Sequence, residues 1–87
     1  MSTSDLIRQR LAALEPETYT LEDESAQHKG HAGAASGGGH FRLTLVSPKF
    51  RDLSTLARHR LVYEAMGELM QREIHALSIT AITPEEL

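Results

Sequence analysis

Apolar residues recur along this chain at two spacings, and the spacing separates helices from strands. Ile7, Leu11 and Leu14 follow one another at helical intervals and predict a first helix. We expect Thr3 or Ser4 to cap this helix and the helix to end near Leu14, because hydroxyl side chains satisfy the free N–H groups of a first turn.

A longer helical pattern lies in the C-terminal half of the chain. Its apolar stripe predicts a helix from a cap at Ser54 to about Arg72. The stripe consists of Leu61, Val62, Ala65, Met66, Leu69 and Met70. We interpret its two methionines as core residues rather than as a metal site. Thioethers suit soft copper(I), but the other side chains near this helix do not.

Alternating apolar and polar residues predict three strands, at 18–23, 40–47 and 76–82. In the first strand Tyr19 and Leu21 are expected to face inward. A short terminal helix should follow the third strand, because Thr83 can cap it and the next residue is proline.

The predicted order is α-β-β-α-β, which indicates a single α+β domain over residues 1–87 with a three-stranded mixed sheet packed on helices. Strands one and two would form an antiparallel hairpin, and the long helix would make strand three parallel to strand two. Parallel strands begin at the same sheet edge, so His40, His75 and the segment 24–39 should meet there. The order resembles a type II KH-like fold, but the GxxG clamp between two helices is missing.

The segment 24–39 has no periodic pattern and holds five of the six glycines. It also holds His28 and His31, and His40 follows it directly, so that three of the five histidines lie within residues 24–40 of a chain without cysteine. A loop of this length is either a loose hairpin connection or a functional segment. Imidazole is a common ligand for transition metals, so metal binding by this chain would rely on these rings or on a partner's sulfur.

The presence of these histidines can also be explained without a metal ion. His28 and His31 are close enough to reach one ion, yet this spacing in a loop is weak evidence by itself. His40 is typical of a structural residue at a sheet edge, and His75 of a cation that caps the C-terminus of a helix. Metal ligation and structural roles both remain open from the residues alone.

Charge and composition argue against two classes of function, constitutive nucleic-acid binding and catalysis. The net charge of −3 argues against a constitutive nucleic-acid binder. The basic residues Arg58, His59 and Arg60, near Lys49, form either a solvated helix face or a phosphate contact. No nucleophile motif is present, so we expect a protein that is not an enzyme.

The compartment is predicted from what the sequence lacks. No run approaches the ~18 apolar residues of a membrane span. The first residues also lack the basic and apolar regions of a signal peptide. We therefore expect a cytoplasmic protein without a membrane partner.

Four segments together resemble the BolA family. They are DESAQH at 23–28, HFRLTLVS at 40–47, RHRLVY at 58–63 and IHALSI at 74–79. The resemblance extends over nearly the whole chain, and the spacing between the last two motifs is specific. It implies the αββαβ domain and a monothiol glutaredoxin as partner, the chain itself being a monomer or a weak homodimer.

The resemblance also implies a [2Fe–2S] cluster shared between the two proteins, with roles in iron–sulfur trafficking and iron homeostasis. Glutaredoxin cysteine and glutathione would supply sulfur, and this chain would supply histidines. His75 matches the family's C-terminal ligand. The loop ligand maps to His28 when counted from Ser25, and to His31 when counted back from His40. We favour His31 because the spacing to the strand is kept.

The BolA resemblance carries an alternative function as well. The family is associated with DNA binding and with transcriptional regulation of stress and morphology genes. In this chain Arg58, Arg60 and Lys49 are the residues expected to contact DNA.

Overall fold

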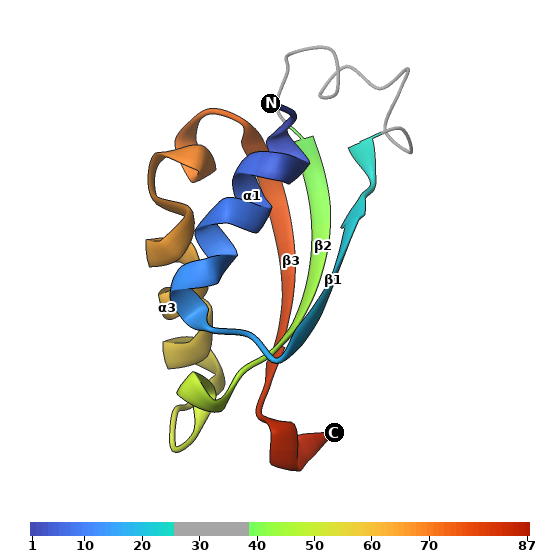
Figure 1. The fold of residues 1–87 in the computed structure, drawn as a ribbon. Coiled ribbons are helices and arrows are strands. Elements are labelled where there is room, and N and C mark those ends of the chain that lie inside the picture. The colour runs from blue at the N-terminus through green and yellow to red at the C-terminus, as the bar shows by residue number, and fades with distance from the viewer. Residues whose placement is uncertain (26–38) are drawn as a thin grey trace.

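Two helices lie against one face of a three-stranded sheet (Figure 1). This computed structural model describes residues 1–25 and 39–87. The helices and strands are α1 (Thr3–Leu11), β1 (Thr18–Asp23), β2 (Gly39–Val46), α3 (Thr55–Met66) and β3 (Ile74–Ile82). The predicted α+β class and the αββαβ order are confirmed.

The sheet has β2 at its centre, with β1 on one side and β3 on the other. β1 pairs with β2 antiparallel, and Tyr19 lies opposite Leu45. β2 pairs with β3 parallel, and Leu43 lies opposite Ile79. The hairpin and the crossover through α3 are therefore as predicted.

Helix α1 begins at Thr3, so its cap lies one residue before the first of the two predicted caps, Thr3 and Ser4. Its cap is Ser2, whose Oγ accepts a hydrogen bond from the backbone N–H of Asp5. The Asp5 carboxylate in turn accepts from the Ser2 backbone N–H, which completes a capping box. The helix ends at Leu11, and a 3-10 turn at Ala12–Leu14 completes the predicted length.

Helix α3 begins as predicted and ends earlier than predicted. The Oγ of Ser54 accepts from the backbone N–H of Ala57 and caps the first turn. Gly67 has a φ of 57° and a ψ of −132°, a combination that side chains disfavour, so α3 ends at Met66. A 3-10 turn at Gly67–Gln71 follows, and the prediction of one helix to Arg72 is wrong.

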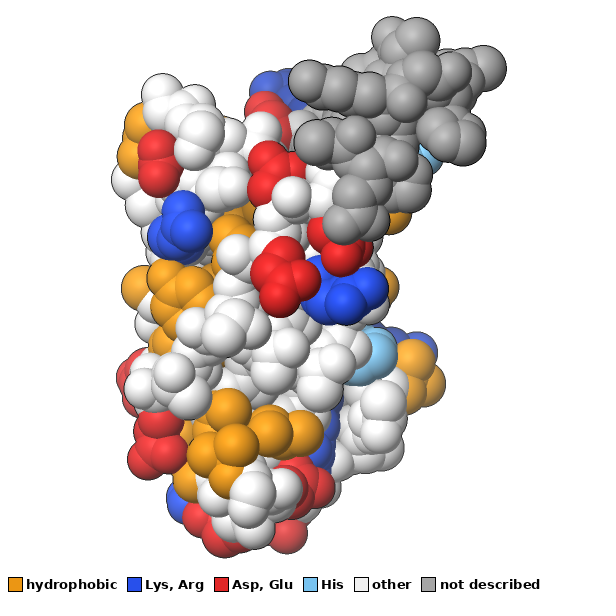
Figure 2. All heavy atoms as spheres, turned by 90° about the vertical axis from the view of Figure 1, so that its right-hand side faces the viewer, with side chains coloured by type: hydrophobic (Ala, Val, Ile, Leu, Met, Phe, Trp, Pro, Cys, Tyr) orange, Lys and Arg blue, Asp and Glu red, His pale blue; other side chains and the backbone are white. Residues whose placement is uncertain are grey.

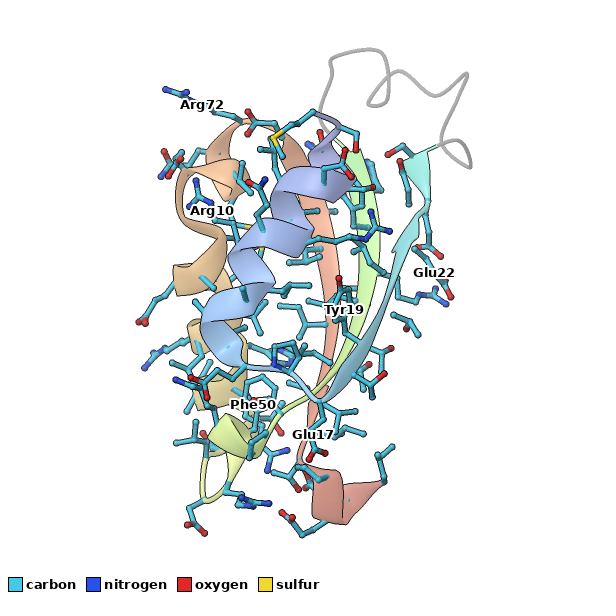
Figure 3. The ribbon with its side chains drawn as sticks, in the orientation of Figure 1. Arg10, Glu17, Tyr19, Glu22, Phe50 and Arg72 are labelled. Atoms are coloured by element: carbon cyan, nitrogen blue, oxygen red, sulfur yellow. The ribbon has the colours of Figure 1, made fainter. Side chains whose placement is uncertain are left out.

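The core lies between the helices and the inner face of the sheet. Its buried members are Ile7, Leu11, Leu14, Phe41, Leu43, Leu45, Phe50, Val62, Met66, Leu69 and Ile74. Figure 3 shows Phe50 between the helices and the strands, with Tyr19 of β1 packed against the same core. Met66 is fully buried and Met70 packs against the cluster, which confirms both as core residues.

Candidate metal centre

A β-bulge near the start of β3 sets the position of His75. Gly39 pairs with Ile74, but the next residue of β2, His40, pairs with Ala76. His75 is therefore an extra residue without a Cα partner in β2, and such bulges re-aim side chains. Ile74 stays in the core at 2% exposure while His75 is exposed.

The position of His75 in a strand excludes the interpretation that this residue caps the C-terminus of the long helix. His75 lies inside β3, whereas α3 ends at Met66 and is capped by Gly67. His75 is therefore not the C-terminal cap of the long helix.

The rings of His40 and His75 face each other across β2 and β3. Their centroids are 5.0 Å apart and their planes are tilted by 43°. The prediction that parallel pairing brings both residues to one sheet edge is confirmed. The sequence interpretation left a structural role and metal ligation open for His40, and its place at the start of β2 was the signal that it lies near His75.

Hydrogen bonds join the residues just before the segment 26–38 to those just after it. The backbone N–H of His40 donates to the Oγ of Ser25 at 3.0 Å, and that of Glu24 donates to the His40 carbonyl at 2.7 Å. The backbone N–H of Ser25 donates to Asp23 at 2.9 Å. Hydrogen bonds from Ser25 hold the pKa of the Asp23 carboxyl below its ordinary value. The backbone at His40 is thus fixed from both strands.

The start of β3 is joined to the same edge. The backbone N–H of Gly39 donates to the carbonyl of Glu73 at 2.8 Å. The Oε2 of Glu73 is buried and has no hydrogen-bond partner among residues 1–25 and 39–87. This end of the molecule therefore contains a polar atom that the described fold leaves unused.

The two predicted loop ligands, His28 and His31, lie outside the described residues. Their segment leaves the fold after Ser25 and returns at Gly39, at the sheet edge that carries His40 and His75 (Figure 1). Within the described part of the chain, no group of three or more His, Asp or Glu side chains is arranged to hold a metal ion. That part offers a pair of imidazoles, and the whole chain offers no thiol.

The basic residues predicted to contact DNA differ in their surroundings. Arg58 donates to the carbonyls of Leu53 and Ala81 at 3.0 and 3.1 Å, and to Glu86 at 2.7 Å. Its side chain is only 14% exposed, so it acts in the fold. Arg60 and Lys49, by contrast, are exposed.

The comparison with known proteins extends over almost all of this fold. The family described as BolA-like protein matches residues 11–86. The chain belongs to the BolA family. Its four BolA-like segments therefore come from shared ancestry rather than chance similarity.

BolA proteins of known structure resemble the chain along its full length. The BolA domain of SufE1 from Arabidopsis thaliana superposes with a TM-score of 0.86 at 40% identity, covering 100% of this chain and 98% of that domain. BolA1 from the same plant gives a TM-score of 0.83 at 34% identity, again with coverages of 100% and 98%. The BolA fold is thus established by sequence and by structure.

The named BolA relatives differ in length and in what their names describe. BolA-like protein 1 of Mus musculus is 46% identical over 85% of this chain, which spans 52% of that protein. The DNA-binding transcriptional regulator BolA of Haemophilus influenzae is 32% identical, with coverages of 99% and 82%. Neither name describes an enzyme. Another relative, Protein BOLA1 of Arabidopsis thaliana, is named as chloroplastic, at 42% identity over 84% of this chain and 48% of its own length.

Among the described residues of this BolA chain, no helix combines the length and hydrophobicity that a membrane crossing requires.

Proposed function

We propose that this chain is the histidine-donating partner of a monothiol glutaredoxin. Together with glutathione, the two proteins would hold a [2Fe–2S] cluster for iron–sulfur trafficking and iron homeostasis. The chain would act in the cytoplasm as a carrier and not as an enzyme. Membership of the BolA family supports this proposal, since the resemblance implies that partner and that cluster.

The position of His75 is the observation that best supports the proposal. The bulge in β3 keeps Ile74 in the core and leaves His75 exposed, which suits a side chain that meets a group held by a second protein. The ring of His75 also has a second imidazole beside it, that of His40. In a chain without cysteine, imidazole nitrogens are the ligands that best suit a shared iron site.

The residues present fit the implied cluster. In Rieske-type centres two histidines bind one iron of a [2Fe–2S] cluster, which raises its reduction potential. Here His75 would bind through a ring nitrogen, and a second histidine would complete the pair. The family resemblance implies His31 or His28 for that second position. The hydrogen bonds of Ser25 and Glu24 to the His40 backbone would keep the edge of the site in place.

Reconstitution tests this function directly. The chain is mixed with a monothiol glutaredoxin, glutathione, iron and sulfide, and visible circular dichroism is recorded. We expect a heterodimer spectrum that differs from that of the glutaredoxin alone and disappears with His75→Ala.

The matched control is His59→Ala, which removes a half-buried histidine from α3. It should leave the heterodimer spectrum unchanged. His28→Ala and His31→Ala are recorded in the same series, because one of them should weaken the spectrum if a loop histidine is the second ligand. A glutaredoxin homodimer spectrum in every sample would reject the proposal.

DNA binding is the second candidate function. The named regulator from Haemophilus influenzae supports it, as do the exposed side chains of Arg60 and Lys49. Figure 2 shows the side of the molecule with β1, where acidic side chains gather, and Figure 3 shows Glu22 pointing outward there. Phosphate contacts would therefore use the α3 side, not the β1 side.

Charge reversal on α3 tests DNA binding. We expect Arg60→Glu to weaken binding to a DNA duplex about tenfold in fluorescence anisotropy and to reduce its salt dependence. The control Arg72→Glu makes the same charge change outside α3, at the exposed residue labelled in Figure 3. Equal effects of the two variants would indicate attraction by net charge alone.

A further inference from the structure

We propose that the outer face of α3 binds a second protein, one that presents carboxylates between apolar side chains. The face consists of Leu56, His59, Arg60 and Tyr63, and we call it the α3 outer face. It lies on a different element from the histidines at the start of β2 and β3, and its occupancy needs neither a metal nor a glutaredoxin. The occupant also differs from that of the second candidate function, because it is a protein and not DNA.

Two large apolar side chains are exposed on this face. Leu56 is 61% exposed and Tyr63 is 42% exposed. The other large hydrophobic residues that are exposed in the described chain are Met1 and Leu87, the first and last residues of the sequence. Away from the two ends, the exposed large apolar residues of the described fold thus lie on one helix. Tyrosine and arginine are enriched where binding energy concentrates in protein interfaces.

Helical geometry brings these residues onto one stripe. Seven residues make almost two turns, so Leu56 and Tyr63 lie about 20° apart around α3 and about 10 Å apart along it. Arg60 lies between them along the axis, about 40° around the helix from Leu56. Val62 is fully buried and Arg58 bonds to β3, and both lie more than about 100° around the helix from Leu56. The stripe therefore faces away from the sheet, on the helix that lies farthest from β1 in Figure 1.

Arg60 supplies a positive charge that the described fold does not neutralise. Ion pairs with carboxylates engage Arg8, Arg10, Arg42, Arg51 and Arg58. Arg60 forms no such pair within residues 1–25 and 39–87, although the exposed Glu64 lies one turn further along α3. A guanidinium can bind a carboxylate through two parallel hydrogen bonds. A cation between two apolar side chains therefore fits an acidic residue of a partner that also covers Leu56 and Tyr63.

Charge argues against a second copy of this chain as the occupant. In a two-fold contact that placed Leu56 of one copy on Tyr63 of the other, the two Arg60 side chains would meet near the axis. Like charges brought together in an interface cost free energy. DNA fits less well too, because phosphates would leave the exposed Leu56 without an apolar partner. An acidic and apolar protein surface matches both the charged and the apolar parts of the face.

The test uses a defined probe, an amphipathic helical peptide of about 18 residues with two leucines one heptad apart and glutamates between them. It is titrated into the isotope-labelled chain and followed by NMR. We expect amide shifts at Leu56, Arg60 and Tyr63 and none at Ser78 of β3. A matched peptide with lysines in place of the glutamates should bind at least tenfold more weakly. Equal affinity for the two peptides, or no shifts on the α3 outer face, would overturn the proposal.

Substitutions in the chain separate the apolar contribution from the charged one. Leu56→Ser and Tyr63→Ser should each weaken binding of the glutamate peptide at least fivefold. Leu87→Ser removes a leucine that is 79% exposed elsewhere, and it should change the affinity less than twofold. Arg60→Glu should reverse the preference, so that the lysine peptide binds more tightly. Circular dichroism confirms that each variant is folded, and unchanged affinity in both Leu56→Ser and Tyr63→Ser would reject the face.

Three further outcomes would assign the face to another occupant and reject the proposal. The first is a dimer in sedimentation velocity that Leu56→Ser dissociates, which indicates a second copy. The second is a DNA duplex that binds more tightly than the glutamate peptide and is lost with Arg60→Glu but not with Leu56→Ser. The third is loss of the reconstituted glutaredoxin spectrum in Tyr63→Ser, which we expect to keep it. If the glutaredoxin cluster fails to form in every sample while the peptide results hold, the proposed function fails and the α3 outer face stands.

Discussion

The hydroxyl of Ser47 donates a hydrogen bond of 2.6 Å to the carbonyl of Leu14, joining the end of β2 to the turn after α1. The same Oγ accepts from the backbone N–H of Lys49 at 3.1 Å. Ser47 is fully buried, so both partners depend on this single side chain. It fixes where the first helix meets the sheet.

Ser47→Ala should therefore destabilise the fold. It leaves the Leu14 carbonyl without its partner in a buried place, which typically costs about 1–3 kcal/mol. Urea unfolding measures the difference. Ser78→Ala, at an exposed position of β3, is the control and should change the free energy of unfolding by less than about 0.5 kcal/mol. Equal stability of the two variants would contradict the role of Ser47.

Gly39→Ala should destabilise the start of β2. A Cβ on Gly39 would lie 2.3 Å from Cε2 of Phe41, whose ring is part of the core. Overpacking of this kind typically costs about 1–3 kcal/mol. Phe41→Leu removes the clashing ring atoms, so the double variant should lose less stability than the two single changes added together. Strict additivity in urea unfolding would rule out the clash.

Ser25→Ala should loosen the edge of the candidate site. It removes the acceptor of the His40 backbone N–H, at a typical cost of about 1 kcal/mol. Hydrogen exchange at the His40 amide should become faster, while exchange at Leu43, in the middle of β2, should follow global stability only. An unchanged exchange rate at His40 would show that Ser25 does not protect it.

Glu86→Gln should destabilise the protein at neutral pH and much less in acid. The Arg58 guanidinium beside Glu86 lowers the pKa of that carboxyl from 4.5 to about 2. Because the folded pKa is the lower one, the carboxylate stabilises the fold above 4.5 and loses this effect as the pH falls towards 2.

Urea midpoints of wild type and Glu86→Gln should thus converge between pH 4.5 and 2. The control is Glu64→Gln on α3, which forms no ion pair within the described residues. Its difference from wild type should stay small throughout. A constant gap for Glu86→Gln would contradict the contribution of its charge.

Local patterns predict most of this fold because each element has a clear period and cap. The alternation at Phe41, Leu43 and Leu45 identifies β2, and the stripe through Val62 and Met66 identifies α3. Helix ends were harder to predict. The capping box at Ser2 and the 3-10 turn after Gly67 depend on reciprocal bonds and on backbone angles that periodicity does not reveal.

The candidate site was predicted in part. Parallel pairing of β2 and β3 indicated that His40 and His75 share an edge, and this follows from topology. The bulge was not predictable, because alternation in β3 does not show where one extra residue enters. Arg58 illustrates the opposite problem. Its basic neighbours suggested a phosphate contact, whereas the acidic turn 84–86 lies far along the sequence and binds it in the fold.

The bulge places His75 outside the contacts that stabilise the fold. His75 has no Cα partner in β2, and its ring lies outside the core. Its loss should leave the sheet intact, and an unloaded molecule should stay folded, unlike zinc fingers that unfold without their metal. The proposed carrier role would use this independence, because such a chain would be loaded and unloaded without unfolding at each exchange.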